Sequence, residues 1–140
     1  MVLIRKARRE DVKALADLHK GEGWCYDDEV VLGDYWDDAF DKESIIVAEM
    51  DGRVVGTIEL AKAYKGRFGY FGVLRRFVVH PGCRGSGIGR RLISYALTEA
   101  KRIGCNALEL SVDPRNERAS RFYESQGSKD ERNDKIMVKP

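Results

Sequence analysis

The sequence is poor in the residues that mark specialised structure. Among 140 residues there are three cysteines, three prolines and two histidines. The cysteines Cys25, Cys83 and Cys105 are odd in number and widely spaced, so no disulfide framework or zinc spacing is present, and we expect reduced thiols and no metal. The apolar stretches fall far short of the ~18 residues of a membrane span. The first six residues also lack the apolar region of a signal peptide. We therefore expect a cytoplasmic protein with no membrane attachment.

Length and composition fit one folded domain. Hydrophobic residues make up 43% of the chain and charged residues 34%, which excludes disorder. A second domain would leave each half too small for a sound core. We predict a single domain over residues 1–140.

Opposite charges separate along the chain although the net charge is only +2. Residues 21–43 contain nine acids and one base, a net charge of −8, and the remaining 24 bases and 14 acids give +10. Four aromatics, Trp24, Tyr26, Tyr35 and Trp36, lie in the acidic segment. Clustered carboxylates attract cationic ligands, although a solvated loop and helix whose aromatics fill the core would show the same composition.

Hydrophobic periodicity predicts a mixed α/β domain with a hairpin-rich first half and a strand–helix–strand second half. The Asp51-Gly52 pair is a strong hairpin signal between two apolar runs. The predicted strands cover residues 2–6, 44–50, 53–64, 70–80, 106–112 and 136–138. The predicted helices cover residues 9–20, 30–40, 87–103 and 116–126.

A glycine-rich turn follows the predicted strand at 70–80 and leads directly into a helix. Gly85, Gly87 and Gly89 alternate there, with Arg84 and Arg90 beside them. Glycines let the backbone approach an anion, and the free N–H groups of a helix start point toward it. The turn therefore predicts a phosphate or pyrophosphate site. A glycine turn used only for close strand–helix packing is the structural alternative.

Two common phosphate motifs do not match this turn. A P-loop requires Gly-x-x-x-x-Gly-Lys-Ser/Thr, but Ile88 follows Gly87. A dinucleotide-binding turn requires Gly-x-Gly-x-x-Gly, and Leu92 occupies the third glycine position.

Two motifs in the right order resemble the GCN5-related N-acetyltransferase (GNAT) superfamily. The first is Arg84-x-x-Gly87-x-Gly89 after a strand that ends in Val79-His80-Pro81. The second is Asn116-x-x-Ala119-x-x-Phe122-Tyr123-x-x-x-Gly127, which is similar to the family's C-terminal motif. The resemblance covers nearly the whole chain. It implies a mixed, mostly antiparallel α+β sheet that splays between two parallel strands, here residues 70–80 and 106–112.

The resemblance implies that acetyl-CoA is the co-substrate and lies between those parallel strands. Its pantetheine arm would pair with the backbone of Phe77, Val78 and Val79. Asn116 would hydrogen-bond the arm, although a helix-capping role fits Asn116 equally well. Its pyrophosphate would bind the loop and helix start formed by Arg84, Gly85, Ser86, Gly87, Ile88, Gly89 and Arg90.

The resemblance also places Tyr123 near the thioester sulfur, where its phenol would protonate the departing thiolate; packing within a helix stripe is the alternative. An amine acceptor is mostly protonated at neutral pH, so a base or water chain must remove a proton. Glu59 is the nearest ionisable candidate, and Glu109 is a weaker one. Either carboxyl group could instead belong to the polar face of a strand, and the sequence leaves the base open.

The expected reaction is direct transfer of an acetyl group to a primary amine in a ternary complex. Because the segment after the first helix usually lines the acceptor side in this family, residues 21–43 predict a cationic acceptor such as a polyamine, a lysine side chain, a peptide N-terminus or an amino sugar. Arg75 and Arg76 argue partly against a cation. A non-catalytic acyl-CoA-binding module is the alternative. No motif supports nucleic-acid binding, and dimers, common in this family, make a homodimer a further expectation.

Overall fold

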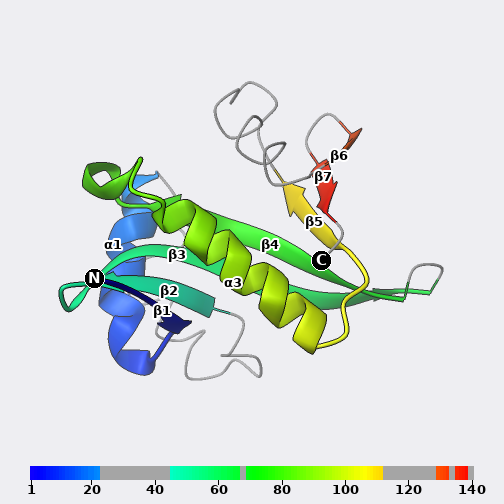
Figure 1. Ribbon diagram of the computed structural model, residues 1–140, viewed down its shortest axis with the longest axis horizontal. Helices are drawn as coiled ribbons and strands as arrows, with labels where there is room; N and C mark the ends of the chain where they lie inside the picture. Colours follow the sequence, from blue (N-terminus) through cyan, green and yellow to red (C-terminus); the bar gives the residue numbers. More distant parts are fainter. Residues whose placement is uncertain (23–44, 67–68, 112–128, 133–134, 139–140) are drawn as a thin grey trace. The chain divides into compact units, whose positions relative to one another are not determined.

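The computed structural model describes residues 1–22, 45–66, 69–111, 129–132 and 135–138 (Figure 1). The helices predicted at 30–40 and 116–126 lie outside these residues. The chain forms two compact units. Unit 1 comprises Met1–Glu59 and Arg76–Ala96, and unit 2 comprises Leu60–Arg75 and Leu97–Pro140. The single domain over residues 1–140 stays a prediction.

The structure confirms the mixed α/β class and the order of the elements within the described residues. The sheet order is β1-β2-β3-β4-β5-β7-β6. The β4–β5 pair is parallel, whereas β1–β2, β2–β3, β5–β7 and β6–β7 are antiparallel. The strands are β1 (Val2–Lys6), β2 (Ile45–Met50), β3 (Arg53–Lys65), β4 (Gly69–Val79), β5 (Leu108–Ser111), β6 (Lys129–Arg132) and β7 (Lys135–Val138). The helices are η1 (Arg9–Asp11), α1 (Val12–Gly21), η4 (Pro81–Cys83) and α3 (Ile88–Arg102).

The hairpin between β2 and β3 turns where the sequence predicts it. Asp51 and Gly52 have φ values of 52° and 80°, the left-handed pair that a tight hairpin requires. The β2–β3 register then aligns Ile46 with Ile58 and Ala48 with Gly56. The register shifts between Ala48 and Glu49, so the turn and this irregularity together set which residues of β3 face each side of the sheet.

In unit 1, helices cover both faces of the sheet (Figure 1). Leu15 and Ala16 of α1 pack with Ile45 and Val47, which alternate along β2. On the other face, a Cβ built on Gly56 would lie 3.1 Å from Leu92 Cδ1, so the missing side chain lets α3 approach β3 closely. Unit 1 therefore has the usual three-layer helix–sheet–helix packing.

Unit 2 contains the parallel pair. Gly72, Val73 and Leu74 of β4 align with Leu108, Glu109 and Leu110 of β5. A Cβ on Gly72 would lie 2.5 Å from Leu108 Cδ2 and 2.8 Å from Leu60 Cδ1, so the core of this unit requires glycine there. Burial raises the pKa of the Cys105 thiol in the same core, which makes it a poor nucleophile.

Three details differ from the sequence prediction. The first turn of the N-terminal helix is a separate 3₁₀ segment, η1, in which the Asp11 carboxylate accepts from the Arg8 backbone N–H at 2.7 Å. The predicted C-terminal strand has an antiparallel partner, β6, that the sequence analysis did not predict. Its residues Lys-Asp-Glu-Arg are all charged, so β6 has no hydrophobic periodicity. Arg76 interrupts the regular backbone of β4 with φ 50°.

Within the described residues, no helix has the length and hydrophobicity needed to cross a bilayer.

Candidate functional site: a phosphate-binding loop

The glycine-rich turn leaves open space where an anion would approach. After β4 ends at Val79, η4 leads into an exposed loop that includes Gly85 and Gly87. These glycines have φ values of 84° and 86°, and a Cβ built on either meets no atom within 4 Å. The positive φ values explain the need for glycine. The open space shows that close packing against a neighbouring element is not the reason for these glycines.

Helix α3 begins directly behind this loop. The backbone N–H of Arg91 donates to the Gly87 carbonyl at 3.2 Å, which marks the start of the helical hydrogen bonds. The N–H groups before Arg91 are the donors that the start of a helix leaves without intrahelical partners. The buried side chain of Ile88 anchors the helix start, while Arg90 is exposed. Amide donors, a positive helix end and exposed arginines together fit a pyrophosphate group.

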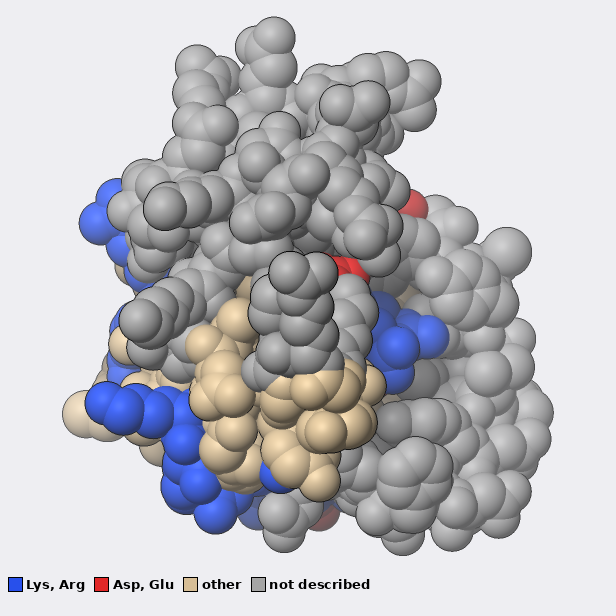
Figure 2. All heavy atoms as spheres, turned by 90° about the vertical axis from the view of Figure 1, so that its right-hand side faces the viewer, with Lys and Arg blue, Asp and Glu red and all other residues tan. Residues whose placement is uncertain are grey.

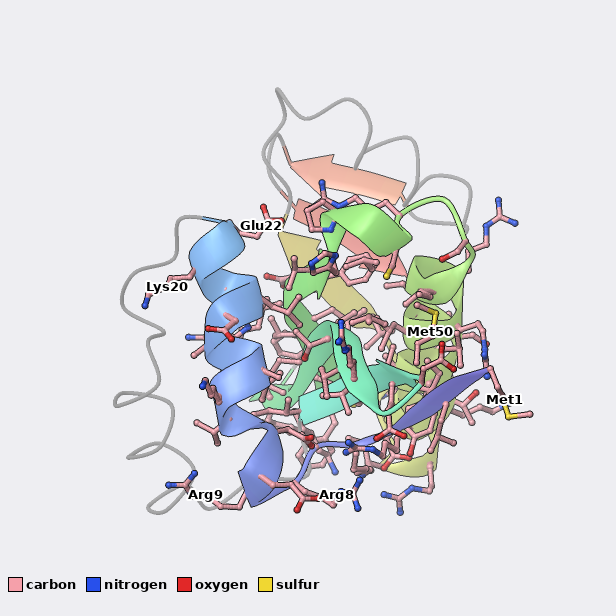
Figure 3. All side chains as sticks on the ribbon, turned by 90° about the vertical axis from the view of Figure 1, so that its left-hand side faces the viewer. Met1, Arg8, Arg9, Lys20, Glu22 and Met50 are labelled. Carbon is pink, nitrogen blue, oxygen red and sulfur yellow. The ribbon has the colours of Figure 1, made fainter. Side chains whose placement is uncertain are left out.

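Arg84 is held in place at the base of the loop. Its Nε donates to the Val79 carbonyl at 3.0 Å, and its Nη2 lies 2.8 Å from the Glu22 carboxylate. Figure 3 labels Glu22 at the end of α1, close to the η4 turn. Sequence reasoning missed this ion pair because the partners lie 62 residues apart.

Other contacts hold the turn itself. The His80 backbone N–H donates to the Val55 carbonyl at 2.7 Å, and its Nδ1 accepts from the Gly82 N–H at 3.1 Å. The Ser86 hydroxyl donates to the Cys83 carbonyl. Arg91 donates to the Val2 carbonyl at 2.8 Å, so its guanidinium stabilises the β1 edge while Arg84 and Arg90 flank the loop.

Glu59, the candidate base on β3, is buried and ion-paired. It is 5% exposed, and its Oε2 lies 2.9 Å from Arg76 Nη1. Arg76 adopts a left-handed backbone conformation that is unusual for a residue other than glycine inside a strand. Such strained positions concentrate at functional sites. The alternating pattern of β4 gave no signal for this irregularity.

The remaining predicted residues divide into two groups. Val78 is buried, Phe77 and Val79 are half-buried at the end of β4, and Glu109 is buried in unit 2. Asn116 and Tyr123 lie outside the described residues. Among the residues that the structure describes, no group of three side chains could hold a metal ion.

Unit 2 carries a cationic surface with exposed tyrosines. Tyr64 and Tyr70 are exposed, their ring centroids lie 5.2 Å apart, and Lys62 Nζ lies 4.2 Å from the Tyr70 ring. Lys101 and Arg102 are exposed at the end of α3. Figure 2 shows Lys and Arg side chains beside uncharged surface on this side.

Comparison with known proteins gives a consistent family. Residues 7–127 match the model of the acetyltransferase (GNAT) family. An uncharacterised N-acetyltransferase from Archaeoglobus fulgidus is 33% identical over 132 residues, covering 88% of this chain and 90% of the relative. An aminoalkylphosphonate N-acetyltransferase from Salmonella typhimurium is 34% identical over 84 residues, covering 59% of this chain and 54% of the relative.

Solved structures share the fold at lower identity. An N-acetyltransferase from Staphylococcus aureus superposes with a TM-score of 0.84 at 17% identity, covering 99% of this chain and 98% of that chain. A PaiA N-acetyltransferase from Thermoplasma acidophilum, solved in complex with coenzyme A, has a TM-score of 0.80 at 22% identity and covers 100% and 99% of the two chains.

The fold and the loop define the class of protein as an acyl-CoA-dependent acetyltransferase. The family match extends over both motifs quoted from the sequence. The chain belongs to the GNAT acetyltransferase family, which confirms the family, the fold and the enzyme class that the sequence predicts.

Proposed function

We propose that this protein transfers the acetyl group of acetyl-CoA to a primary amine of a small cationic or peptide acceptor, by direct attack in a ternary complex. The observation that carries the proposal is the exposed loop with two positive-φ glycines, open space above them and a helix start behind. The family match and the coenzyme A complex of a structural neighbour support the choice of ligand.

The loop residues would bind the pyrophosphate of acetyl-CoA. Amide N–H groups from Gly85 to Arg90, among them those of Ser86, Ile88 and Gly89, would donate to phosphate oxygens, and the guanidinium groups of Arg84 and Arg90 would neutralise the charge. The backbone of Phe77 to Val79 would pair with the pantetheine arm, and Asn116 would hydrogen-bond the same arm. Acetyl-CoA supplies the activated acetyl group.

Starting from the ammonium form, acetyl transfer removes two protons from nitrogen and delivers one to sulfur, so one proton is released overall. Glu59 is the proposed acceptor for the ammonium proton, directly or through water, because it is a buried carboxylate on β3 that lies beside the irregular Arg76 of β4. The neutral amine nitrogen would then attack the thioester carbonyl, the C–S bond would break, and Tyr123 would donate its phenolic proton to the thiolate. The second proton of the nitrogen would leave to give the amide and restore the Tyr123 phenol through solvent. Glu109 remains the second candidate base.

The acceptor is proposed to be cationic because residues 21–43 carry a net charge of −8. The ion pair with Glu59 compensates the charge of Arg76, which weakens the objection that this arginine would repel a cation. The Salmonella relative is named for an aminoalkylphosphonate, an amine that also carries an anionic group. Anionic amines are therefore the informative competitors.

A thiol-release assay with acetyl-CoA and a panel of amines tests the proposal. We expect kcat/KM for spermidine to exceed that for 2-aminoethylphosphonate and glutamate at least tenfold. Preference for either anionic amine would overturn the cationic acceptor. Binding of acetyl-CoA without thiol release on any amine would favour the non-catalytic binding module.

Gly87→Ala is expected to raise the KM for acetyl-CoA about tenfold. The new Cβ forces an unfavourable positive φ on alanine and occupies space where the phosphate would approach. Gly104→Ala is the matched control, since Gly104 has φ 88° and equally open surroundings at the end of α3. Both variants should lose about 1 kcal/mol of stability. An equal rise in KM in both would refute a phosphate-binding role for Gly87.

A further inference from the structure

The ion pair between Glu22 and Arg84 places an internal anion at the proposed pyrophosphate site. Arg84 Nη2 lies 2.8 Å from Glu22 Oε1, and the two side chains are 37% and 34% exposed. Glu22 follows the last residue of α1, and its backbone N–H donates to the His19 carbonyl at 3.1 Å. The end of the helix, where Figure 3 labels Glu22, therefore holds this carboxylate against the arginine.

The side chain of Glu22 does not stabilise the helix that carries it, although its backbone N–H caps the helix end. The C-terminal end of a helix bears partial negative charge, so a carboxylate there is unfavourable unless a cation compensates it. Arg84 supplies that cation. Any ligand that draws the guanidinium away from Glu22 leaves the carboxylate in an unfavourable field.

Arg84 does not need Glu22 in order to face the loop. Its Nε already donates to the Val79 carbonyl at 3.0 Å, which fixes the plane of the guanidinium from within its own turn. Arginine has five N–H donors, so the outer nitrogens are the ones that can exchange partners. Glu22 and a phosphate group would compete for these outer donors.

We infer that Glu22 sets the affinity of the site for coenzyme A by competing with the pyrophosphate for Arg84. This inference rests on the proposed function. Before the ligand binds, the carboxylate neutralises the arginine. Once the pyrophosphate takes the guanidinium, Glu22 becomes an uncompensated negative charge beside another anion. Both effects weaken binding of acetyl-CoA and of product CoA, and they favour product release.

Glu22→Gln is the direct test because it keeps the size of the side chain and removes its charge. We expect the Kd for CoA, measured by isothermal titration calorimetry, to fall about two- to fivefold, the scale of a partly exposed ion pair. The gain should disappear when Glu22→Gln is combined with Arg84→Gln. Binding of S-acetylpantetheine, which lacks the pyrophosphate, should not change.

Asp17→Asn provides the matched control, since Asp17 is an exposed acid on the same helix. It should change the Kd for CoA much less than Glu22→Gln does. Thermal unfolding adds an independent measurement: without ligand, Glu22→Gln should be no more stable than the wild type, although it binds CoA more tightly.

The possible failures are distinguishable. Weaker or unchanged CoA binding by Glu22→Gln would overturn the inference and leave the proposed function intact, as would an equal gain in Asp17→Asn. A wild-type protein that binds no CoA would overturn the proposed function and this inference with it.

Discussion

Replacing Tyr123 by phenylalanine is expected to lower kcat for acetyl transfer about 100-fold, within the range typical of a lost general acid. The variant keeps the aromatic ring and removes only the phenolic O–H. We therefore expect the KM for acetyl-CoA to stay within about twofold of the wild-type value. A selective loss in kcat indicates an interaction made mainly in the transition state.

The physical reason lies in the leaving group. A thiolate that leaves without a proton remains a strong nucleophile and can reverse the reaction. A phenol with an ordinary pKa near ~10 holds its proton at neutral pH and can deliver it as negative charge builds on sulfur. Phenylalanine leaves this proton to solvent.

Tyr95→Phe is the control for Tyr123→Phe. Tyr95 is a half-buried tyrosine on α3 to which no catalytic role is assigned, so its kcat should match the wild type. Single-turnover thiol release separates chemistry from product release. Unchanged single-turnover rates in Tyr123→Phe would refute the assignment, whatever happens to steady-state turnover.

Local sequence signals predicted the described strands other than β6, the hairpin and the glycine-rich turn, because each depends on neighbouring residues. Asp51-Gly52 requires only its own two backbone conformations, and the loop requires only glycines before a helix start. Both are short-range properties, so the pattern alone identifies them.

Contacts between distant residues could not be read from the same pattern. Glu22 meets Arg84, and Glu59 meets Arg76, only because strands and helices bring them together. The left-handed conformation of Arg76 likewise has no local signal, since arginine does not favour it. These contacts lie at the candidate site, where local sequence preferences are most often overridden.

The distribution of charge also shows that contacts between distant residues cannot be read from the sequence. The sequence separates an acidic segment from a basic remainder, which indicates two surfaces of opposite charge. Within the described residues, Glu22, the first acid of that segment, lies 2.8 Å from Arg84 of the loop. The separation of charge along the sequence therefore indicates which ligands each part attracts. The position of the Glu22–Arg84 ion pair comes only from the structure.

Asp11→Asn is expected to destabilise the protein by about 3 kcal/mol at neutral pH. Asp11 is 5% exposed and accepts two hydrogen bonds from Arg5, at 2.8 Å and 3.0 Å, and one from the Arg8 N–H. Removing one partner of a buried ion pair leaves the other charge poorly compensated. Arg5 keeps a contact with Glu49 at 3.1 Å, which holds the loss at the lower end of the usual range.

The destabilisation should depend on pH. Burial alone would raise the pKa of Asp11, but the hydrogen bonds from Arg5 and the Arg8 backbone outweigh it and lower the pKa below its ordinary value. The unfolded chain therefore binds a proton more readily than the folded one. The stabilisation by Asp11 is fully present above the unfolded pKa, near pH ~4, and is lost as the pH falls through the folded pKa.

Denaturant unfolding at pH 7 and pH 3 measures this dependence. The difference in unfolding free energy between the wild type and Asp11→Asn should shrink on acidification, because the asparagine has no proton to gain. Glu10→Gln is the control: Glu10 pairs with Arg8 at 3.2 Å, but both side chains are more than half exposed. Its effect should stay within about 0.5 kcal/mol at either pH. A difference that is equally large at both pH values would mean that packing, and not the ionised carboxylate, is what Asp11 contributes.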